Sequence, residues 1–404
     1  MSEFKNLPSR CKVVRLGEIC NVKQGLQIPI SERFCENAQN RYFYITNEFL
    51  KEKSEVKYYI ENPPESTICF CDDILMTRTG NTGRIVTNVS GVFHNNFFKI
   101  IYDRKIIKKE YLVFCLTGPK TQNEILKRAG SSTIPDLNHG DFLSIKISIP
   151  PLDEQEKIAE ILSTWDEAIN LTINLIESKK QFKKALMQNL LTAKIRFPEF
   201  KDEWEEIRLG NIGKSYNGLI GKVAEDFQNG NSNFITYKNI FDNPKIDINI
   251  FEKVKIMEDE EQNLVKFGDI FFTTSSETPN EVGISSVLLS KCGILYLNSF
   301  CFGFRLNNFE ILAPCFAVFY FRSDCFRKQI FKLAQGSTRF NISKTEVLNL
   351  NIKIPNLDEQ QKIAEILTTC DDEINLLNLK LENLKKQKQG LMQKLLSGKV
   401  RARI

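Results

Sequence analysis

Apolar residues recur three and four positions apart over two long stretches of this chain, and this spacing predicts two long helices. The second stretch runs from Ile363 to Leu395, and only Lys388 interrupts its apolar seam. The first stretch, from Ile158 to Leu190, keeps the same spacing but has more polar residues in its middle. A period of 3.5 residues sustained over about 40 residues favours coiled-coil packing over an ordinary surface helix.

The two helical stretches are copies of each other. The sequence Leu-Asp-Glu-Gln-Glu-Lys-Ile-Ala-Glu-Ile-Leu at 152–162 returns at 357–367 with a single substitution, a displacement of 205 residues. The same displacement continues downstream, where Asp166 matches Asp371. Because such a repeat is a strong sign of duplicated architecture, we expect the whole chain to be built twice.

Both helices are expected to begin in the same way. Prolines precede each copy, and proline ends a preceding element because it lacks an amide donor. Asp153 and Asp358 follow, each three residues before Glu156 or Gln361. This spacing predicts that the two aspartates are N-caps in capping boxes.

The sequence before each helix predicts a compact domain of mixed strands and helices. Strand-like runs such as Tyr42–Thr46 alternate with polar loops, and helices are expected at Glu110–Arg128 and Phe316–Leu333. A strand is expected at Phe142–Ile149. The predicted segments are a first domain at 1–151, a helix at 152–196, a second domain at 197–356 and a helix at 357–404.

The predicted fold class is therefore α/β (mixed), with two repeated domains alternating with two long helices. If the halves pack about a pseudo-two-fold axis, the helices form an antiparallel coiled coil. Each domain would then present its loops in a symmetry-related direction. Paired sites at a fixed spacing are a property of duplex DNA, to which two-fold proteins are matched.

Two polar loops in each domain are the candidate contact surfaces. The repeated frame is kept between the domains while the loop side chains differ, and binding residues tend to lie on loops that a rigid scaffold positions. Arginine, asparagine and hydroxyl side chains suit contacts with base edges or phosphates, although plain solvated hairpins are the alternative. The candidate DNA-binding residues are Arg78, Thr79, Asn81, Thr82, Arg84, Ser131, Ser132, Thr133 and Asn138 in the first domain, and Thr274, Ser275, Ser276, Ser337, Thr338, Arg339, Asn341 and Lys344 in the second.

Composition narrows the class of protein. Residues 1–151 carry 21 basic and 16 acidic side chains, and residues 200–355 carry 18 and 19, so charge alone does not identify a nucleic-acid binder. Eleven cysteines without a Cys-x-x-Cys pair suit a reducing cytosol, and two histidines make a histidine-rich metal site improbable. The sequence has no apolar run long enough to span a bilayer. We expect a cytoplasmic protein.

The chain resembles the specificity subunit of type I restriction–modification systems over essentially its whole length. The most specific signature is the Pro-x-Leu-Asp-Glu-Gln…Ile-Ala-x-Ile-Leu…Asp block, found at Pro150–Asp166 and Pro355–Asp371. An Arg-Leu-Gly-x-Ile opening at Arg15–Ile19 and Arg208–Ile212 supports it, as does a Gly-Asp-Ile-Leu-like strand at Asp72–Leu75 and Gly268–Phe271.

The resemblance implies a subunit with no catalytic centre, no cofactor and no metal of its own. It implies that the chain reads a bipartite double-stranded DNA sequence, one half per target-recognition domain. It further implies docking of two methyltransferase subunits and of restriction–translocase subunits, on which AdoMet, ATP and Mg²⁺ would be bound. The alternatives are an orphan specificity subunit that serves methylation only, and a structural coiled-coil adaptor that does not bind DNA.

Overall fold

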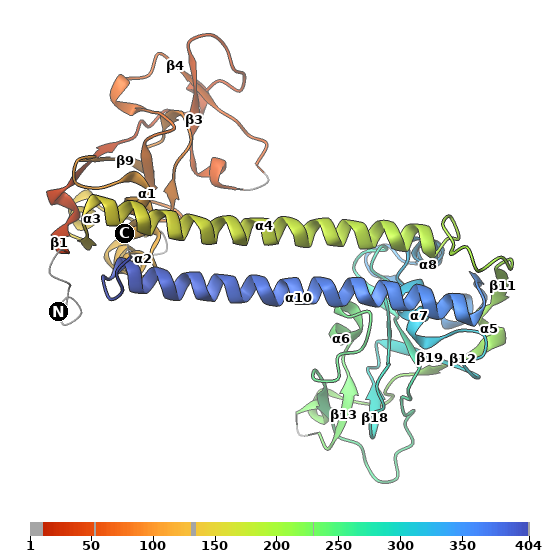
Figure 1. Cartoon of the computed structure of the whole chain (residues 1–404). Helices are drawn as coiled ribbons and strands as arrows, with labels where there is room; N and C mark the ends of the chain where they lie inside the picture. The colour runs from red at the N-terminus through yellow and green to blue at the C-terminus, as the bar shows by residue number, and fades with distance from the viewer. Residues whose placement is uncertain (1–10, 52–53, 131–134, 229, 403–404) are drawn as a thin grey trace. The chain divides into compact units, whose positions relative to one another are not determined.

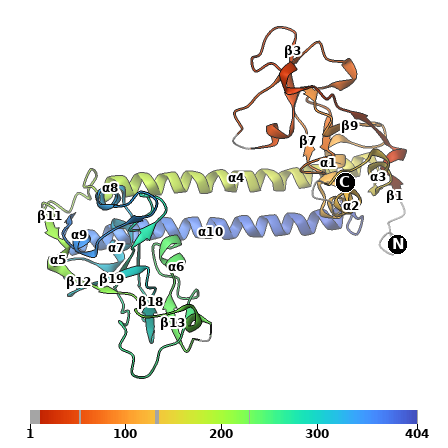
Figure 2. The same ribbon diagram turned by 180° about the vertical axis from the view of Figure 1, so that it is seen from behind.

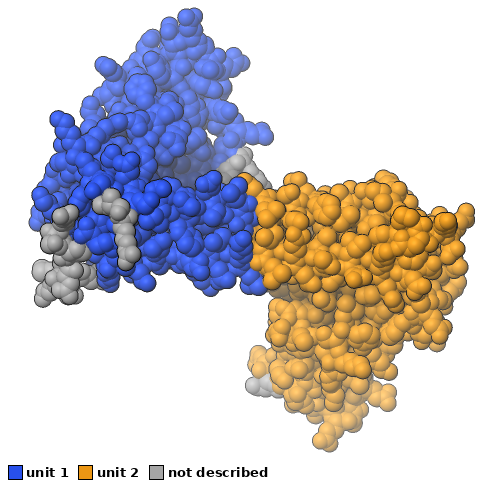
Figure 3. Space-filling model, in the orientation of Figure 1, with its two compact units in different colours: residues 1–173, 379–404 blue, residues 174–378 orange. Residues whose placement is uncertain are grey.

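The computed structural model describes residues 11–51, 54–130, 135–228 and 230–402. These residues form two compact units, one of residues 1–173 with 379–404 and the other of residues 174–378 (Figure 3). Each unit contains one globular domain together with a part of each long helix. The predicted duplication is therefore present at the level of folded units.

The globular part of the first unit is built on two four-stranded sheets, in the strand orders β2-β9-β6-β7 and β4-β3-β8-β5. A separate ribbon pairs β1 with β10. The strands are β1 (Lys12–Arg15), β2 (Cys20–Gln24), β3 (Arg41–Ile45), β4 (Tyr59–Glu61), β5 (Ile68–Cys69), β6 (Ile74–Thr77), β7 (Ile85–Val86), β8 (Gly91–Phe93), β9 (Phe97–Tyr102) and β10 (Lys146–Ile149). The helices are α1 (Lys109–Thr117), α2 (Pro119–Ala129) and α3 (His139–Leu143), with 3-10 turns η1 (Leu16–Glu18), η2 (Ile30–Glu32), η3 (Asn47–Leu50) and η4 (Glu65–Thr67).

The second unit repeats this plan. Its sheets have the orders β12-β19-β15-β17 and β14-β13-β18, and β11 pairs with β21 as β1 pairs with β10. In both units one strand pair is parallel, β3 with β8 and β13 with β18. The strands are β11 (Glu205–Arg208), β12 (Gly213–Asn217), β13 (Ser232–Ile235), β14 (Glu252–Val254), β15 (Ile270–Thr273), β16 (Ser275–Ser276), β17 (Ser285–Val287), β18 (Leu295–Leu297), β19 (Cys301–Leu306), β20 (Phe340–Asn341) and β21 (Asn351–Ile354). The helices are α5 (Leu209–Ile212), α6 (Tyr237–Asp242), α7 (Pro314–Tyr320), α8 (Asp324–Leu333) and α9 (Lys344–Leu348), with the 3-10 turn η5 (Ala224–Phe227).

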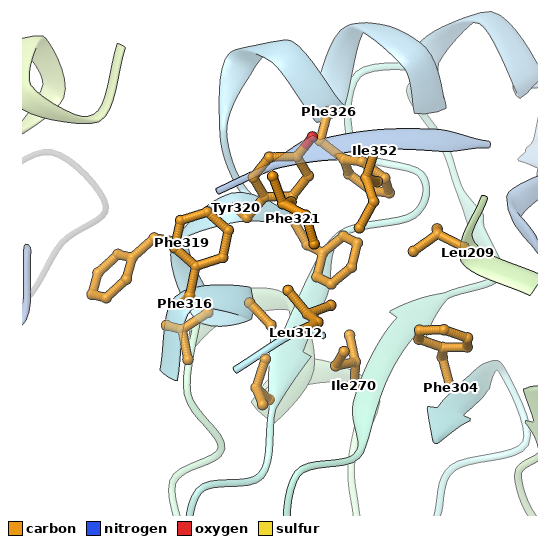
Figure 4. Close-up of a cluster of buried hydrophobic side chains, with 14 of the residues drawn as sticks. Leu209, Ile270, Phe304, Leu312, Phe316, Phe319, Tyr320, Phe321, Phe326 and Ile352 are labelled. Atoms are coloured by element: carbon orange, nitrogen blue, oxygen red, sulfur yellow. The ribbon is translucent and has the colours of Figure 1, made fainter. Parts of the chain in front are cut away.

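Aromatic side chains fill the core of the second unit between its main sheet and α7–α8 (Figure 4). Phe272 and Phe302 stack with ring centroids 5.3 Å apart, and Phe321 meets Phe326 edge to face at 4.7 Å. Such pairs add about 0.5–1.5 kcal/mol each beyond the area they bury. The core thus fixes the strands whose ends carry the polar loops.

The long helices α4 (Leu152–Leu190) and α10 (Leu357–Leu396) have the lengths that the repeat predicts (Figures 1 and 2). Within the first unit, Ile158 and Leu162 near the start of α4 share one core with Met392 and Leu395 near the end of α10. Within the second unit the start of α10 shares a core with the end of α4 in the same way. The predicted antiparallel pairing is confirmed within each unit.

The lysine that interrupts the apolar seam is partnered in the structure. Lys388 forms an ion pair with Asp166 in the first unit, and its ammonium lies 5.4 Å from the centre of the Phe114 ring. In the second unit Lys183 pairs with Asp371 and lies 5.3 Å from the Phe319 ring. A partly buried lysine needs such a counterion because removing its charge from water is costly.

The repeated Glu-Gln of the block has a structural role in each unit. The carboxylate of Glu154, almost fully buried, accepts hydrogen bonds from both Nε (2.6 Å) and Nη2 of Arg401. The carboxylate of Glu359 accepts from Nε (3.0 Å) and Nη2 (2.7 Å) of Arg196. Both arginines follow the opposite long helix in the sequence, so each pair ties the end of one helix to the start of the other.

The neighbouring glutamine connects the start of each long helix to its globular domain through hydrogen bonds. Gln155 accepts a hydrogen bond from the backbone N–H of Lys108 (2.9 Å) and donates to the carbonyls of Ile106 and Pro150. Gln360 makes the equivalent three bonds in the second unit. Since both glutamines are 0% exposed, this full satisfaction is what allows a polar side chain at that position.

The predicted capping boxes are wrong. The helices begin at Leu152 and Leu357, one residue before the aspartates, so Asp153 and Asp358 stand inside the first turn. In the second copy Asn356 fills the capping role, its side chain accepting from the backbone N–H of Glu359 (3.0 Å). The capping-box pattern misled because each helix starts at the leucine before the aspartate, which leaves the aspartate inside the helix rather than at its N-cap.

Three further predicted elements are broken in the structure. The helix expected at Glu110–Arg128 is two helices, because Pro119 starts a new helix after Gly118. The helix expected at Phe316–Leu333 is likewise α7 and α8, separated at Phe321–Ser323, where Ser323 caps α8. The strand expected at Phe142–Ile149 begins only at Lys146, after α3.

The glycine of each Arg-Leu-Gly opening allows a close approach of two segments. A Cβ added to Gly17 would lie 3.3 Å from Leu143, and one added to Gly210 would lie 3.2 Å from the Leu348 carbonyl.

Among the described residues, no helix combines the length and the apolar character that crossing a membrane requires.

Candidate nucleic-acid interface

The two polar loops predicted in the first domain meet in the first unit. Thr79 and Asp136 form an isolated antiparallel bridge, and the backbone N–H of Leu137 donates to the carbonyl of Arg78 (3.0 Å). The loops are therefore one composite surface, set at the end of the buried strand β6.

Arg78 holds this composite surface together. Its Nε and Nη2 donate to the two oxygens of Asp136 at 3.1 and 2.8 Å, and its Nη1 donates to Oε1 of Gln24 at 3.2 Å. The hydrogen bonds from Arg78 and then from Thr79 hold the pKa of Asp136 below its usual range. Bidentate arginine–carboxylate pairs are geometrically specific, so Arg78 faces its own fold in this structure.

Other predicted residues of the first domain also have internal partners. The Thr79 hydroxyl donates to Asp136, and the Thr82 hydroxyl lies within hydrogen-bonding distance of the carbonyls of Arg78 (3.0 Å) and Pro135 (2.7 Å). Arg84 donates from Nη1 to the carbonyl of Leu50 at 3.0 Å.

Two predicted amide side chains of this domain differ in their environment. Asn81 is exposed in a left-handed conformation (φ 53°), and its side chain makes no hydrogen bond with another described residue. Asn138 caps α3, where its side chain accepts from the backbone N–H of Asp141 at 2.8 Å. The candidates Ser131, Ser132 and Thr133 lie outside the described residues.

The two polar loops of the second domain also meet, as a short antiparallel ribbon. Ser275 of β16 faces Asn341 of β20, and Ser276 faces Phe340. The backbone N–H of Ile342 donates to the carbonyl of Thr274 (3.1 Å), as Leu137 does to Arg78 in the first unit. Equivalent backbone positions thus carry arginine in one domain and threonine in the other.

The remaining candidates of the second domain are mostly exposed. Ser337, Thr338, Arg339 and Asn341 all lie at the surface. Ser275 and Ser276 are buried, and the Ser276 hydroxyl contacts a carboxylate oxygen of Glu281 at 3.2 Å. Lys344 donates a hydrogen bond to the side chain of Asn217.

A hollow of about 340 Å³ opens beside this ribbon. It is lined by Tyr237, Phe241, Ser275, Ser276, Glu277, Glu281, Phe300 and Arg339. Tyr237 stacks on Phe241 with ring centroids 6.0 Å apart, and its hydroxyl donates to the Ser275 carbonyl at 2.9 Å. Phe300 is 58% exposed, so an aromatic face and two acids border the predicted contact residues.

Sequence reasoning missed the aromatic and acidic members of this hollow. Glu277 directly follows the predicted serines and could have been found, but only cations, amides and hydroxyls were selected there. Tyr237 and Phe300 come from segments whose proximity only the fold creates. Within the described ranges, no group of three or more His, Cys, Asp or Glu is arranged to hold a metal ion.

Comparison with known proteins identifies the repeated domain. Residues 8–178 and 201–386 match the family model described as type I restriction modification DNA specificity domain. The MjaVIII specificity subunit of a type I restriction enzyme from Methanocaldococcus jannaschii is 26% identical over 98% of this chain and 94% of that protein. A putative MjaX specificity subunit from the same organism is 29% identical over 74% of this chain and 69% of that protein.

Solved structures share the fold. The HsdS subunit from Thermoanaerobacter tengcongensis superposes with a TM-score of 0.56 and 18% identity, covering 99% of this chain and 100% of that chain. The type I restriction–modification S subunit from M. genitalium gives a TM-score of 0.55 and 16% identity, covering 97% of each chain.

Proposed function

Because this chain belongs to the type I restriction–modification DNA specificity family, we propose that it reads a DNA target in two separate halves, one in each globular domain. The chain is a specificity subunit and not an enzyme in its own right.

The observation that carries the proposal is the same composite loop surface, found once in each unit with different side chains. The backbone N–H of Arg78 donates to the carbonyl of Asn96, and that of Thr274 donates to the carbonyl of Phe300, so the two positions are equivalent. One scaffold with two sets of contact residues suits two different half-sites.

Partners supply the chemistry in this proposal. Two methyltransferase subunits and the restriction–translocase subunits would dock on the chain, and AdoMet, ATP and Mg²⁺ would be bound by those partners. Apolar side chains exposed on the long helices are the surface we assign to docking. In the second unit these are Leu175 and Phe182 on α4 and Leu376 on α10, and in the first unit Leu171 and Ile173 on α4 and Leu379 on α10. Large apolar groups exposed on a helix favour packing of a partner helix.

Sequencing of methylated adenines tests the proposal. DNA from cells that express the chain with its cognate methyltransferase subunit should carry one split motif with a fixed gap. A contiguous motif, or no motif dependent on the chain, would contradict it. A plasmid-cleavage assay with the restriction subunit added separates a full restriction complex from one that serves methylation only.

Single-residue variants test the division between domains. Asn81 in the first unit and Asn341 in the second are both exposed on their loop surfaces. Because Asn81 is left-handed (φ 53°), a conformation that glycine tolerates, Asn81→Gly and Asn341→Ala are the changes that should leave folding intact. Each lost bidentate base contact weakens discrimination by about 1–3 kcal/mol. We expect Asn81→Gly and Asn341→Ala to relax different halves of the motif. Relaxation of both halves by either variant would contradict reading by separate domains.

A further inference from the structure

Two opposite charges adjoin the last residue pair of the ribbon in the second unit. The antiparallel register pairs Ser275 with Asn341 and Ser276 with Phe340; Glu277 directly follows Ser276 in the chain, and Arg339 directly precedes Phe340. Both side chains are exposed, and both line the hollow beside the ribbon.

These two charges are available for a ligand. Neither the Glu277 carboxylate nor the Arg339 guanidinium forms a hydrogen bond or an ion pair with another described residue. The second acid of the hollow, Glu281, is already engaged by the hydroxyls of Ser276 (3.2 Å) and Thr278 (2.8 Å). Glu277 thus has both carboxylate oxygens free of partners among the described residues, whereas one oxygen of Glu281 is engaged; the Arg339 guanidinium is free as well.

The first unit shows the contrast. There the arginine and the carboxylate on the facing loops, Arg78 and Asp136, close on each other in a bidentate pair. The equivalent positions in the second unit are Thr274 and Asn341, which carry no charge. In the second unit backbone pairing holds the ribbon together, and its charged residues, Glu277 and Arg339, lie just outside the paired residues.

A carboxylate at a DNA-facing surface needs a specific reason. Phosphates repel it, and the second domain has no excess of cations to offset that repulsion, with 18 basic against 19 acidic residues over 200–355. In the major groove a carboxylate can accept a hydrogen bond from an amino group, above all N4 of cytosine. Arginine donates in bidentate fashion to O6 and N7 of guanine. A two-stranded ribbon fits within the major groove.

We propose that Glu277 and Arg339 together read one C·G base pair in the half-site of the second unit. Arg339 donates to O6 and N7 of the guanine, and Glu277 accepts from N4 of the cytosine across the same pair. This inference rests on the proposed function, because it takes the ribbon to be the DNA-reading surface of that unit.

The test uses the full chain assembled with its cognate methyltransferase subunit. The methylated motif of the wild-type complex is sequenced first. The methylation rate is then measured on duplexes that carry each of the four base pairs at every position of the motif. Glu277→Ala and Arg339→Ala are compared with Glu258→Ala and Lys291→Ala, which remove a charge of the same sign from exposed positions outside the hollow.

We expect both hollow variants to lose preference at one and the same C·G pair, by about 5- to 150-fold, the range of one good base contact. The other half-site should be unchanged, and the control variants should keep the wild-type motif. Unchanged thermal unfolding of each variant would exclude a folding defect.

Three results would overturn the inference alone while leaving the split target intact. These are a split motif whose two halves contain no C·G pair, variants that relax two different positions, and variants that leave every C·G preference as in the wild type. A chain that directs no split methylation at all would overturn the proposed function, and this inference with it.

Discussion

Replacing Arg401 by alanine should loosen the first unit by removing the counterion of a buried carboxylate. Arg401 follows α10 and holds Glu154 in the first turn of α4 through Nε (2.6 Å) and Nη2. The Glu154 side chain is 2% exposed and the Arg401 side chain 35%. The variant therefore leaves the Glu154 carboxylate charged and buried, and water can reach it only through the space that the arginine side chain vacates.

The expected loss follows from that geometry. Breaking a buried ion pair by removing one partner costs about 3–5 kcal/mol. Because a third of Arg401 is already exposed, water can partly solvate the stranded carboxylate, and we expect about 2–3 kcal/mol. A second change, Glu154→Gln, removes the stranded charge, so the double variant should be more stable than Arg401→Ala alone.

The repeat supplies a matched variant in the other unit. Arg196→Ala breaks the pair with Glu359, whose side chain is 1% exposed while that of Arg196 is 22% exposed. Since this pair is more buried, its loss should be at least as large. Denaturant unfolding of the full chain gives the magnitudes, and hydrogen exchange measured by mass spectrometry locates them.

Arg401→Ala should reduce protection in β1, β10 and the adjoining helix ends of the first unit, and Arg196→Ala should act on the second unit. A change below about 0.5 kcal/mol, the range of ordinary surface substitutions, would refute the reasoning. Equal loss of protection in both units after one substitution would refute it as well.

Two further outcomes test local features of the structure. Ala193→Gly should stabilise the chain by about 0.5–1 kcal/mol, because Ala193 adopts φ 57° after α4, where a left-handed alanine is strained and the repeat has Gly398 at φ 72°. Gly398→Ala should destabilise the chain, and the order of the two unfolding midpoints checks both expectations. Arg78 and Thr79 hold the pKa of the Asp136 carboxyl low in the folded state. The stability that the ionised carboxylate contributes is therefore fully present above the unfolded-state pKa and is lost as pH falls through the folded-state pKa. After correction for the intrinsic exchange rate, which itself falls on acidification, protection of loop 78–84 against hydrogen exchange should therefore drop as pH falls in the wild type but much less in Asp136→Asn. An identical pH profile of protection for both would contradict the assignment.

The sequence alone was sufficient for the features that depend on local pattern and on repetition. The apolar period predicted both long helices, and the 205-residue repeat predicted the duplicated α/β units that the structure contains. The polar loops after β6 and β15 were found because glycine and short polar residues interrupt apolar runs. These signals are encoded within a few turns of helix or a few residues of strand. Local patterns failed where neighbouring breakers decided the outcome, as at Pro119.

Only the tertiary structure decided which distant side chains meet. Arg78 reaches Asp136 across 58 positions, and Arg401 reaches Glu154 across 247. Glu277 and Arg339 line the same hollow because the backbone pairing of β16 with β20 brings their segments together. A shift of one residue in that register would turn each side chain to the other face of the ribbon. Register depends on how the whole core packs, and this is the physical reason why the loops could be predicted from the sequence but the partners of their side chains could not.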